Sequence, residues 1–335
     1  MSRAANVGGQ GVEGMGGFKD IRYAEEALSA RSYGAALLAA AQADPRIVCL
    51  GADLSQPTET AAFRDALPDR FFMMGIQEAN MIGAAGGMAR SGDIPFCHSF
   101  CVFVTRRVYD QVAMQAAYPK LPVKIVGFIP GLATELGVSH QAIDDLSLMR
   151  SLPNMAVIEP SGPEQVGAAV AEALAYDGPV YLRLAINWTK GEAMTPLQPF
   201  KLGKGLALRE GGDVAILAIG GMVAEALAAA DLLAARGVSA TVVNMASLKP
   251  LDAGLVRDLA GRHRLLVTAE NHSIIGGLGS AVSEVLADAG AGIRLARIGV
   301  QDEFAEGGTT AYLLDKYGLS APHIAERVAA ALRDV

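Results

Sequence analysis

Short apolar runs alternate with longer amphipathic stretches over most of the chain. In the first part we predict buried strands at 46–51, 71–75, 94–99, 122–128, 155–159 and 179–184. Helices are predicted at 32–43, 81–89, 105–118, 144–151 and 163–175, the last one opened by a capping box at 161–164. Strands that alternate with helices in this way usually pair in parallel, so the pattern predicts an α/β fold.

The same alternation starts again beyond residue 204, with strands at 213–220, 240–244 and 265–270 and a helix at 223–236. We therefore predict two doubly wound α/β domains at 30–187 and 205–335, each with a mostly parallel sheet and helices on both faces. Between them, 188–204 lacks any period and is predicted to be a linker. Residues 1–29 are Gly-rich and predicted to be a flexible tail, because their dinucleotide-type glycine spacing has no strand before it and no helix after it.

Composition excludes several classes of function. The net charge of -7 and the absence of a basic cluster argue against a nucleic-acid partner. No apolar run reaches the roughly 20 residues that cross a bilayer, so no membrane association is expected. Cys49, Cys97 and Cys101 show no metal-binding spacing, and such sparse cysteines predict reduced thiols and a cytoplasmic location.

One acidic residue, Glu78, is predicted to lie between the end of the strand at 71–75 and the start of the next helix. In parallel sheets this edge, at the carboxyl ends of the strands, is where ligands bind. Judged by position alone, an acid that complements the helix dipole is the commoner explanation. The motifs around Glu78 change that judgement.

Several motifs, in order, resemble the transketolase superfamily. Residues 75–83 and 99–112 resemble its pyrimidine-binding domain, and Gly-Val-Ser-His-Gln at 137–141 fits its loop histidine. Residues 249–252 and 270–279 resemble the C-terminal transketolase domain, which is similar in deoxyxylulose phosphate synthases and 2-oxo acid dehydrogenase beta subunits. The Gly-Asp-Gly motif with which transketolases hold Mg²⁺ and the cofactor's diphosphate occurs nowhere in the sequence. The chain therefore resembles the C-terminal half of a split transketolase.

The resemblance implies thiamine diphosphate as the cofactor and assigns site residues. Thiamine chemistry needs a carboxylic acid at a ring nitrogen of the cofactor's aminopyrimidine, and Glu78 matches that acid. Phe100 and Phe103 match the aromatic positions that pack the same ring, with core packing as the alternative for both. His140 matches a histidine that contacts the substrate near the reacting carbon, with a structural hydrogen bond as its alternative. Ile76 either supports the bent shape of the cofactor or simply packs.

The function that the resemblance implies is a transketolase-like transferase of the EC 2.2.1 type. It would move a two-carbon ketol unit from a ketose donor to an aldehyde acceptor. It would need an N-terminal partner subunit that carries Gly-Asp-Gly and the Mg²⁺ ligands, in a heterotetramer. A 2-oxo acid dehydrogenase-type beta subunit that passes an acyl unit to a carrier, or a non-catalytic assembly subunit, are the alternatives. Phe128, Leu136, and either Ile186 or Ala185, align where the family places polar substrate ligands, which predicts an acceptor other than an ordinary sugar phosphate.

Overall fold

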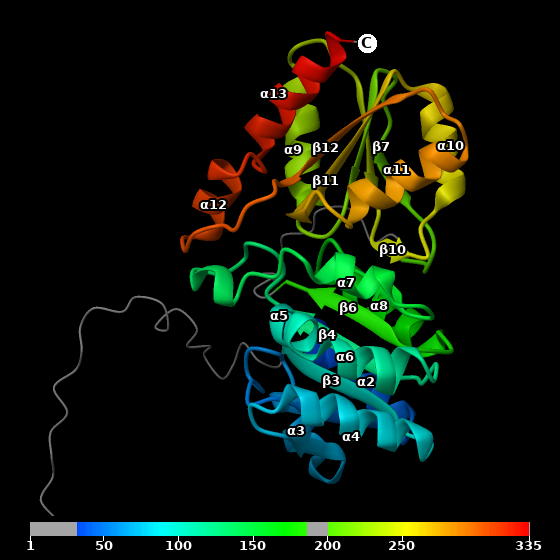
Figure 1. The fold of residues 1–335 in the computed structure, drawn as a ribbon, viewed down its shortest axis with the longest axis vertical. Coiled ribbons are helices and arrows are strands. Elements are labelled where there is room, and N and C mark those ends of the chain that lie inside the picture. The colour runs from blue at the N-terminus through cyan, green and yellow to red at the C-terminus, as the bar shows by residue number, and fades with distance from the viewer. Residues whose placement is uncertain (1–31, 186–199, 335) are drawn as a thin grey trace, which may run out of the picture.

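A computed structural model describes residues 32–185 and 200–334 and shows two sheets with their helices, one above the other (Figure 1). The predicted tail at 1–29, its glycine motif and most of the predicted linker lie outside the described residues. The predicted boundaries at 187 and 205 therefore stay predictions. None of the helices in the described ranges is long and apolar enough to cross a membrane.

The first sheet has seven strands in the order β10-β5-β6-β4-β3-β1-β2, and only β10 runs antiparallel to its neighbour. Its strands are β1 (Ile47–Gly51), β2 (Phe71–Met73), β3 (Ile94–Phe100), β4 (Lys124–Phe128), β5 (Ala156–Ile158), β6 (Val180–Leu184) and β10 (Ser247–Lys249). Five neighbouring strands of this sheet are buried over their whole length: β5, β6, β4, β3 and β1. Strands are buried in this way when a parallel sheet is covered on both faces.

Helix α2 packs against α8 on this sheet, whereas α4 packs against α6 and the π-helical turn η4. The helices are α2 (Ser32–Ala43), α3 (Ala61–Ala66), α4 (Glu78–Arg90), α5 (Cys101–Val104), α6 (Tyr109–Val112), α7 (Asp145–Ser151) and α8 (Pro163–Ala175). Shorter turns are η2 (Pro68–Arg70), η3 (Arg106–Val108), η4 (Ala113–Ala117) and η5 (Gly137–Ser139).

Two local predictions were wrong. The single helix predicted at 105–118 is divided into η3 and a longer stretch formed by α6 and η4, because Val108 leaves the helical region between them (φ -127°, ψ 25°). The predicted capping box is also absent: Gly162 is the N-cap of α8, and the Gln165 side chain accepts hydrogen bonds from the Ser161 N–H and hydroxyl.

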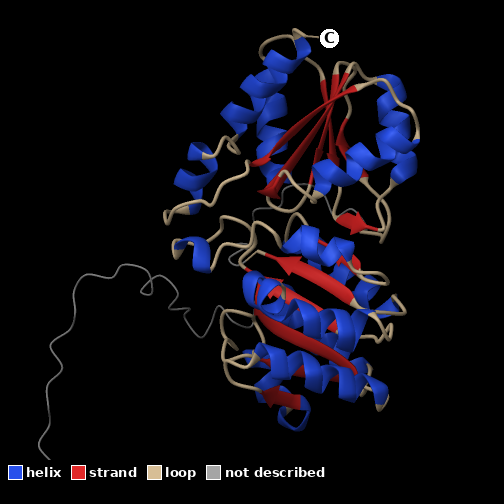
Figure 2. Cartoon of the chain, viewed as in Figure 1, coloured by secondary structure: helices blue, strands red, loops and turns tan. Residues whose placement is uncertain are grey.

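The second sheet has five strands in the order β12-β11-β8-β9-β7, parallel except for β7 at one edge. Helices α9 and α13 cover one face and α10 and α11 the other (Figure 2). The strands are β7 (Leu206–Arg209), β8 (Val214–Ala218), β9 (Ala240–Asn244), β11 (Leu265–Ser273) and β12 (Arg294–Val300). The helices are α9 (Met222–Ala234), α10 (Ala253–Arg262), α11 (Leu278–Asp288), α12 (Thr310–Lys316) and α13 (Ala321–Leu332). The predicted fold class, α/β with two mostly parallel sheets, is confirmed.

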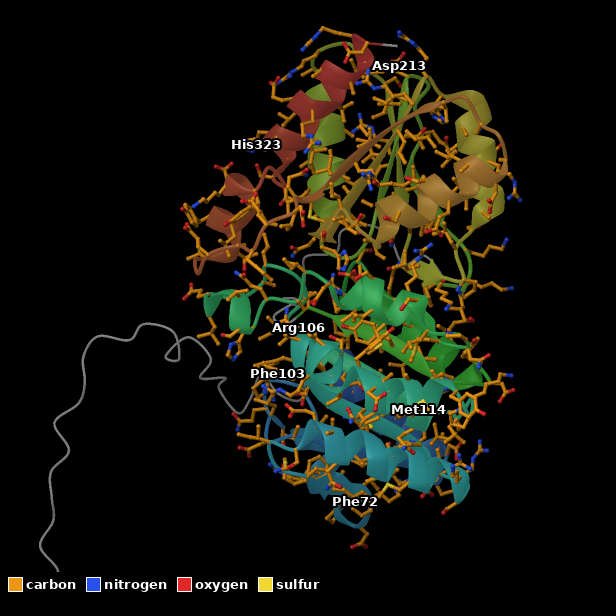
Figure 3. The ribbon with its side chains drawn as sticks, in the orientation of Figure 1. Phe72, Phe103, Arg106, Met114, Asp213 and His323 are labelled. Atoms are coloured by element: carbon orange, nitrogen blue, oxygen red, sulfur yellow. The ribbon has the colours of Figure 1, made fainter. Side chains whose placement is uncertain are left out.

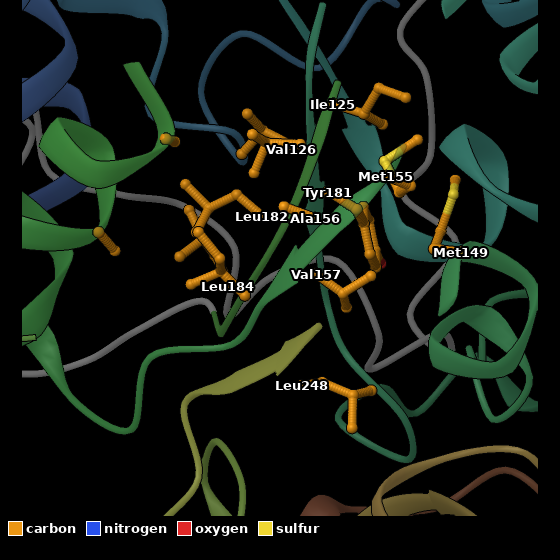
Figure 4. Close-up of a cluster of buried hydrophobic side chains, with 14 of the residues drawn as sticks. Ile125, Val126, Met149, Met155, Ala156, Val157, Tyr181, Leu182, Leu184 and Leu248 are labelled. Atoms are coloured by element: carbon orange, nitrogen blue, oxygen red, sulfur yellow. The ribbon is translucent and has the colours of Figure 1, made fainter. Parts of the chain in front are cut away.

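Strand β10 ties the two sheets together. It follows β9 in the chain, yet it pairs antiparallel with β5 of the first sheet, with Ser247 opposite Ile158. Its Leu248 is buried in the same apolar cluster as Val157 and Tyr181 (Figure 4). The second half of the chain thus completes the core of the first, which holds the surfaces of the two halves in register around the site.

Candidate active site

A cavity of about 600 Å³ lies at the carboxyl ends of the strands of the first sheet and reaches the start of α9 in the second half. The five predicted site residues all line it: Ile76, Glu78, Phe100, Phe103 and His140. This is the edge at which open parallel sheets bind ligands. These five residues come from three separate stretches of the sequence, 75–83, 99–112 and 137–141.

Glu78 is the first residue of α4, so the predicted place at the start of a helix is confirmed. Its side chain is only 3% exposed. The Ser99 hydroxyl, at the end of β3, donates to Oε1 at 3.2 Å, and Arg107 Nη1 donates to Oε1 at 3.0 Å and Oε2 at 2.9 Å. A buried carboxylate next to an open cavity, with a cation on one side, is a typical feature of catalytic sites.

Aromatic side chains form one wall beside this carboxylate. The ring centroids of Phe100 and Phe103 lie 6.0 Å apart, and the His140 ring lies 5.2 Å from that of Phe103, edge to face. The guanidinium carbon of Arg107 lies 3.8 Å from the Phe103 centroid (Figure 3 labels Phe103). Phe100 is almost fully buried in the core cluster, so the packing alternative also describes it, whereas Phe103 is open to the cavity.

His140 follows the turn η5 and keeps one ring nitrogen engaged. Its Nδ1 lies 2.9 Å from the Ser139 hydroxyl. Burial, and then the positive charge of Arg107, lower the pKa of His140 below its ordinary value. The imidazole is therefore neutral at neutral pH, with Nε2 left to exchange a hydrogen bond or a proton with a ligand.

The predicted substrate positions have three different outcomes. Leu136 lines the cavity. Phe128 does not: it is fully buried, and its ring packs edge-on against Tyr33 with centroids 5.5 Å apart, so the register that placed it in the site was wrong. Ile186 lies outside the described residues, whereas its alternative, Ala185, lines the cavity. Among the described residues that line the cavity, the acids are Asp53, Glu78, Glu135 and Glu159, and none is Lys or Arg.

A buried ion network adjoins the cavity through Glu159 and Asn271, and its centre is Arg183, which is fully buried at the second-to-last position of β6. It donates to both carboxylate oxygens of Asp145 (2.7 and 3.0 Å), to Glu159 Oε1 (2.9 Å) and to the Asn271 carbonyl (3.1 Å). Asn271 belongs to β11, and its Oδ1 accepts from the Leu132 N–H at 3.0 Å. The network therefore joins the second sheet to the loop that carries His140.

Sequence reasoning missed Ser99, Arg107 and Arg183. The first two lie within the motif at 99–112, but nothing in the sequence says that they converge on Glu78. Arg183 stands in an apolar strand, where a charged residue is itself a signal of a buried partner. Within the described ranges, no group of three or more His, Cys, Asp or Glu side chains is placed to hold a metal ion.

Comparison with known proteins agrees with this geometry. Residues 27–187 match the transketolase pyrimidine binding domain, and residues 203–324 match the transketolase C-terminal domain. The 6-deoxy-6-sulfo-D-fructose transketolase subunit SqwH of Clostridium sp. (strain MSTE9) is 48% identical over 86% of this chain and 89% of its own length. A Methanocaldococcus jannaschii protein named as a transketolase C-terminal section is 40% identical, over 89% of this chain and 94% of its own.

Among solved structures, one described as "Split gene transketolase, inactive beta4 tetramer" superposes with a TM-score of 0.83 at 46% identity. The superposition covers 90% of this chain and 97% of the split-gene transketolase chain. The chain belongs to the transketolase family.

Proposed function

We propose that this chain is the C-terminal subunit of a split transketolase that uses thiamine diphosphate to transfer a two-carbon ketol unit from a ketose to an aldehyde. The observation that carries the proposal is the buried Glu78 carboxylate beside the open face of Phe103, at the ligand-binding edge of the sheet. The relatives named as a transketolase subunit and as a split-gene transketolase support the subunit assignment.

The residues present fit the pyrimidine end of the cofactor. Glu78 provides a carboxyl group for a ring nitrogen, Phe103 and Phe100 provide apolar faces for a flat ring, and Ile76 is an exposed apolar side chain at the same edge. When bound, thiamine diphosphate supplies a nucleophilic carbon that accepts and releases the two-carbon unit. The chain offers no Gly-Asp-Gly for the diphosphate and Mg²⁺, so we assign those ligands to an N-terminal partner subunit.

The side chains of this chain have three tasks in the proposed reaction. Glu78 shares a proton with the ring nitrogen, and the burial of the Glu78 side chain keeps water away from that proton. The Phe100 and Phe103 rings exclude water from the reacting face. The neutral His140 imidazole, whose Nε2 is available, moves a proton to or from a substrate hydroxyl.

The proposed assembly is a heterotetramer with two copies of this chain. Support comes from α4, where Gly83 and Gly87 have no neighbouring atom within 4 Å of the place a Cβ would take. A helix face of this kind allows close packing against another subunit. Sedimentation of the active complex tests the stoichiometry: a stable, fully active one-to-one heterodimer would contradict it.

For the acceptor, we propose an aldehyde without a phosphate group. The cavity lining supports this, since its charged groups among the described residues are carboxylates, and Leu136, which we align with a polar substrate ligand of the family, lines it as an apolar side chain. The Clostridium relative, named for 6-deoxy-6-sulfo-D-fructose, makes that ketose a second candidate donor. Its sulfonate would need a cation from Arg106, Arg107 or the partner subunit.

Reconstitution with the N-terminal partner tests the function. We expect ketol transfer only when both subunits, thiamine diphosphate and Mg²⁺ are present, in a screen that pairs each donor with phosphorylated and unphosphorylated aldehydes. Decarboxylation of a 2-oxo acid with acyl transfer to a carrier would support the alternative enzyme, and no turnover with any donor would support an assembly subunit. Tight, Mg²⁺-dependent binding of thiamine diphosphate by this chain alone would contradict the split-enzyme proposal.

A further inference from the structure

His140 lies in a loop whose two ends are joined to each other. Gly131 and Ala142 form an antiparallel bridge, in which the N–H of each residue donates to the carbonyl of the other, at 3.0 and 3.1 Å. The residues between them, 132–141, include Leu136 and His140, which both line the cavity. Apart from the turn η5, this described stretch contains no helix or strand. Its place at the cavity therefore depends on contacts with other parts of the molecule.

One of these contacts is made by Asn271, a residue of β11 in the second half of the chain. Its Oδ1 accepts a hydrogen bond from the Leu132 N–H at 3.0 Å, and its Nδ2 donates a longer one to the Pro130 carbonyl at 3.4 Å. A Cβ atom on Gly131 would lie 2.2 Å from the Asn271 carbonyl oxygen, so only glycine lets the two backbones come this close. The Asn271 amide therefore holds the start of the loop on both sides of Gly131.

The second half also contacts the other end of the loop. The buried Gln141 side chain, next to His140, donates from Nε2 to the Glu306 carbonyl at 2.8 Å. Glu306 precedes α12, which lines the cavity through Thr310 and Leu314. Both ends of the loop are thus held by the second half of the chain.

We propose that Asn271 is a positioning residue, which acts through the loop at 132–141 to hold the His140 imidazole where it meets a substrate. The inference rests on the proposed function, in which His140 moves a proton to or from a substrate hydroxyl. Proton transfer of this kind needs heavy atoms about 2.6–3.2 Å apart. A displacement of about 1 Å can lower the rate about 100-fold. Without the Asn271 amide, the Leu132 N–H and the Pro130 carbonyl would lose these partners, and the loop would be free to shift.

The test is a double-mutant cycle in the reconstituted two-subunit enzyme. Asn271→Leu keeps a side chain of similar size without a hydrogen-bonding group, and is expected to lower kcat about ten-fold and to change KM by less than about three-fold. His140→Gln removes the imidazole and is expected to lower kcat about 100-fold. Because the loop then has no imidazole to place, adding Asn271→Leu to His140→Gln should lower kcat by less than about two-fold further.

Gln301→Ala is the matched control. This exposed amide of the same half of the chain donates to the Gly299 carbonyl and not to the loop, so kcat should stay within about two-fold of the wild-type value. Losses of kcat that add fully in the double variant would overturn the inference, because Asn271 would then act independently of His140. A rise in KM that persists in the His140→Gln background would also overturn it, because Asn271 would then bind the substrate directly.

Hydrogen exchange of the full chain separates the inference from the proposed function. In Asn271→Leu the Leu132 amide loses its acceptor, and we expect its exchange to become about ten-fold faster or more, while β4 and β6 exchange at the wild-type rate. This measurement needs neither cofactor nor substrate, so it tests the hold on the loop even if the complex shows no ketol transfer and the proposed function fails. Equal exchange in the variant and the wild type would overturn the inference. Should Asn271→Leu not fold, Asn271→Ala is measured in the same two ways, with the same outcomes expected.

Discussion

Glu78 and Glu159 both line the cavity and each pairs with an arginine, but the two arrangements differ in one respect. In the Glu78–Arg107 pair the carboxylate is buried, but 44% of the arginine side chain is exposed. In the network of Arg183 with Asp145 and Glu159, the arginine and both acids are all buried. A cation that reaches solvent can leave its partner at modest cost, whereas one enclosed on every side cannot. The first pair can exchange its contacts with a ligand, and the second fixes the architecture next to it.

The two acids of the buried network also differ from each other. Burial opposes the charge on Asp145, but the Arg183 guanidinium holds its pKa below the ordinary value. Burial raises the pKa of Glu159 to about 7, and Arg183 offsets this only in part. Geometry explains the difference: Arg183 donates to both oxygens of Asp145 but to one oxygen of Glu159, and Glu159 Oε2 is buried without a hydrogen-bond partner. Asp145 is therefore the permanent partner, and Glu159 can hold a proton.

The largest expected effect comes from breaking the enclosed network. Arg183→Ala leaves two buried acids without their cation, and we expect the free energy of unfolding to fall by about 3–5 kcal/mol. Urea unfolding of the chain measures this. Arg106→Ala is the matched control, because it removes an arginine whose pair with Asp144 is exposed and is expected to cost less than about 1 kcal/mol. Similar costs for the two variants would show that enclosure does not distinguish them.

The second largest effect is expected for the Glu78–Arg107 pair at the cavity, and it should appear in the turnover of the enzyme rather than in its stability. Glu78→Gln fills the same space but cannot exchange a proton with a ring nitrogen, so we expect turnover of the reconstituted enzyme to fall about 100- to 10,000-fold. Folding should change little, because the half-exposed Arg107 can be solvated when the acid loses its charge. Turnover above a tenth of the wild-type value would assign Glu78 another role. A large loss of stability in Glu78→Gln would show that the Glu78–Arg107 pair supports the fold as the Arg183 network does.

The sequence predicted more of the fold than of the site's internal contacts. Apolar runs predicted nine of the strands within a few residues, because strands buried on both faces leave a continuous apolar signal, as in β4 and β8. They missed the partly exposed edge strands β7 and β12. The same signal did not reveal that β10 joins the first sheet, since pairing between distant segments leaves no local pattern. Motifs located Glu78, Phe103 and His140. They misplaced Phe128, because a register drawn through a loop of uncertain length does not say which side chains face inward.

A smaller effect should separate the two acids of the network by pH. Since the pKa of Glu159 is raised from 4.5 to about 7, the folded state holds its proton more tightly than the unfolded state does. The resulting stabilisation is complete below pH 4.5 and is lost as the pH rises through 7. Glu159→Gln does not titrate, so its stability relative to the wild type should improve by about 1–3 kcal/mol between pH 5 and pH 8. Chemical unfolding at the two pH values measures the change, and a constant difference would mean that Glu159 is charged throughout.

The smallest effect is expected at Phe103, whose ring lines the cavity beside Glu78. Phe103→Leu removes the flat ring that would stack on the cofactor's aminopyrimidine but keeps an apolar side chain in its place. We therefore expect the dissociation constant of the two-subunit complex for thiamine diphosphate to rise only about two- to five-fold. Calorimetry on the wild-type and variant complexes measures the change, with Phe304→Leu, an exposed position, as the control. A dissociation constant that changes no more in Phe103→Leu than in Phe304→Leu would show that the Phe103 ring does not contact the cofactor.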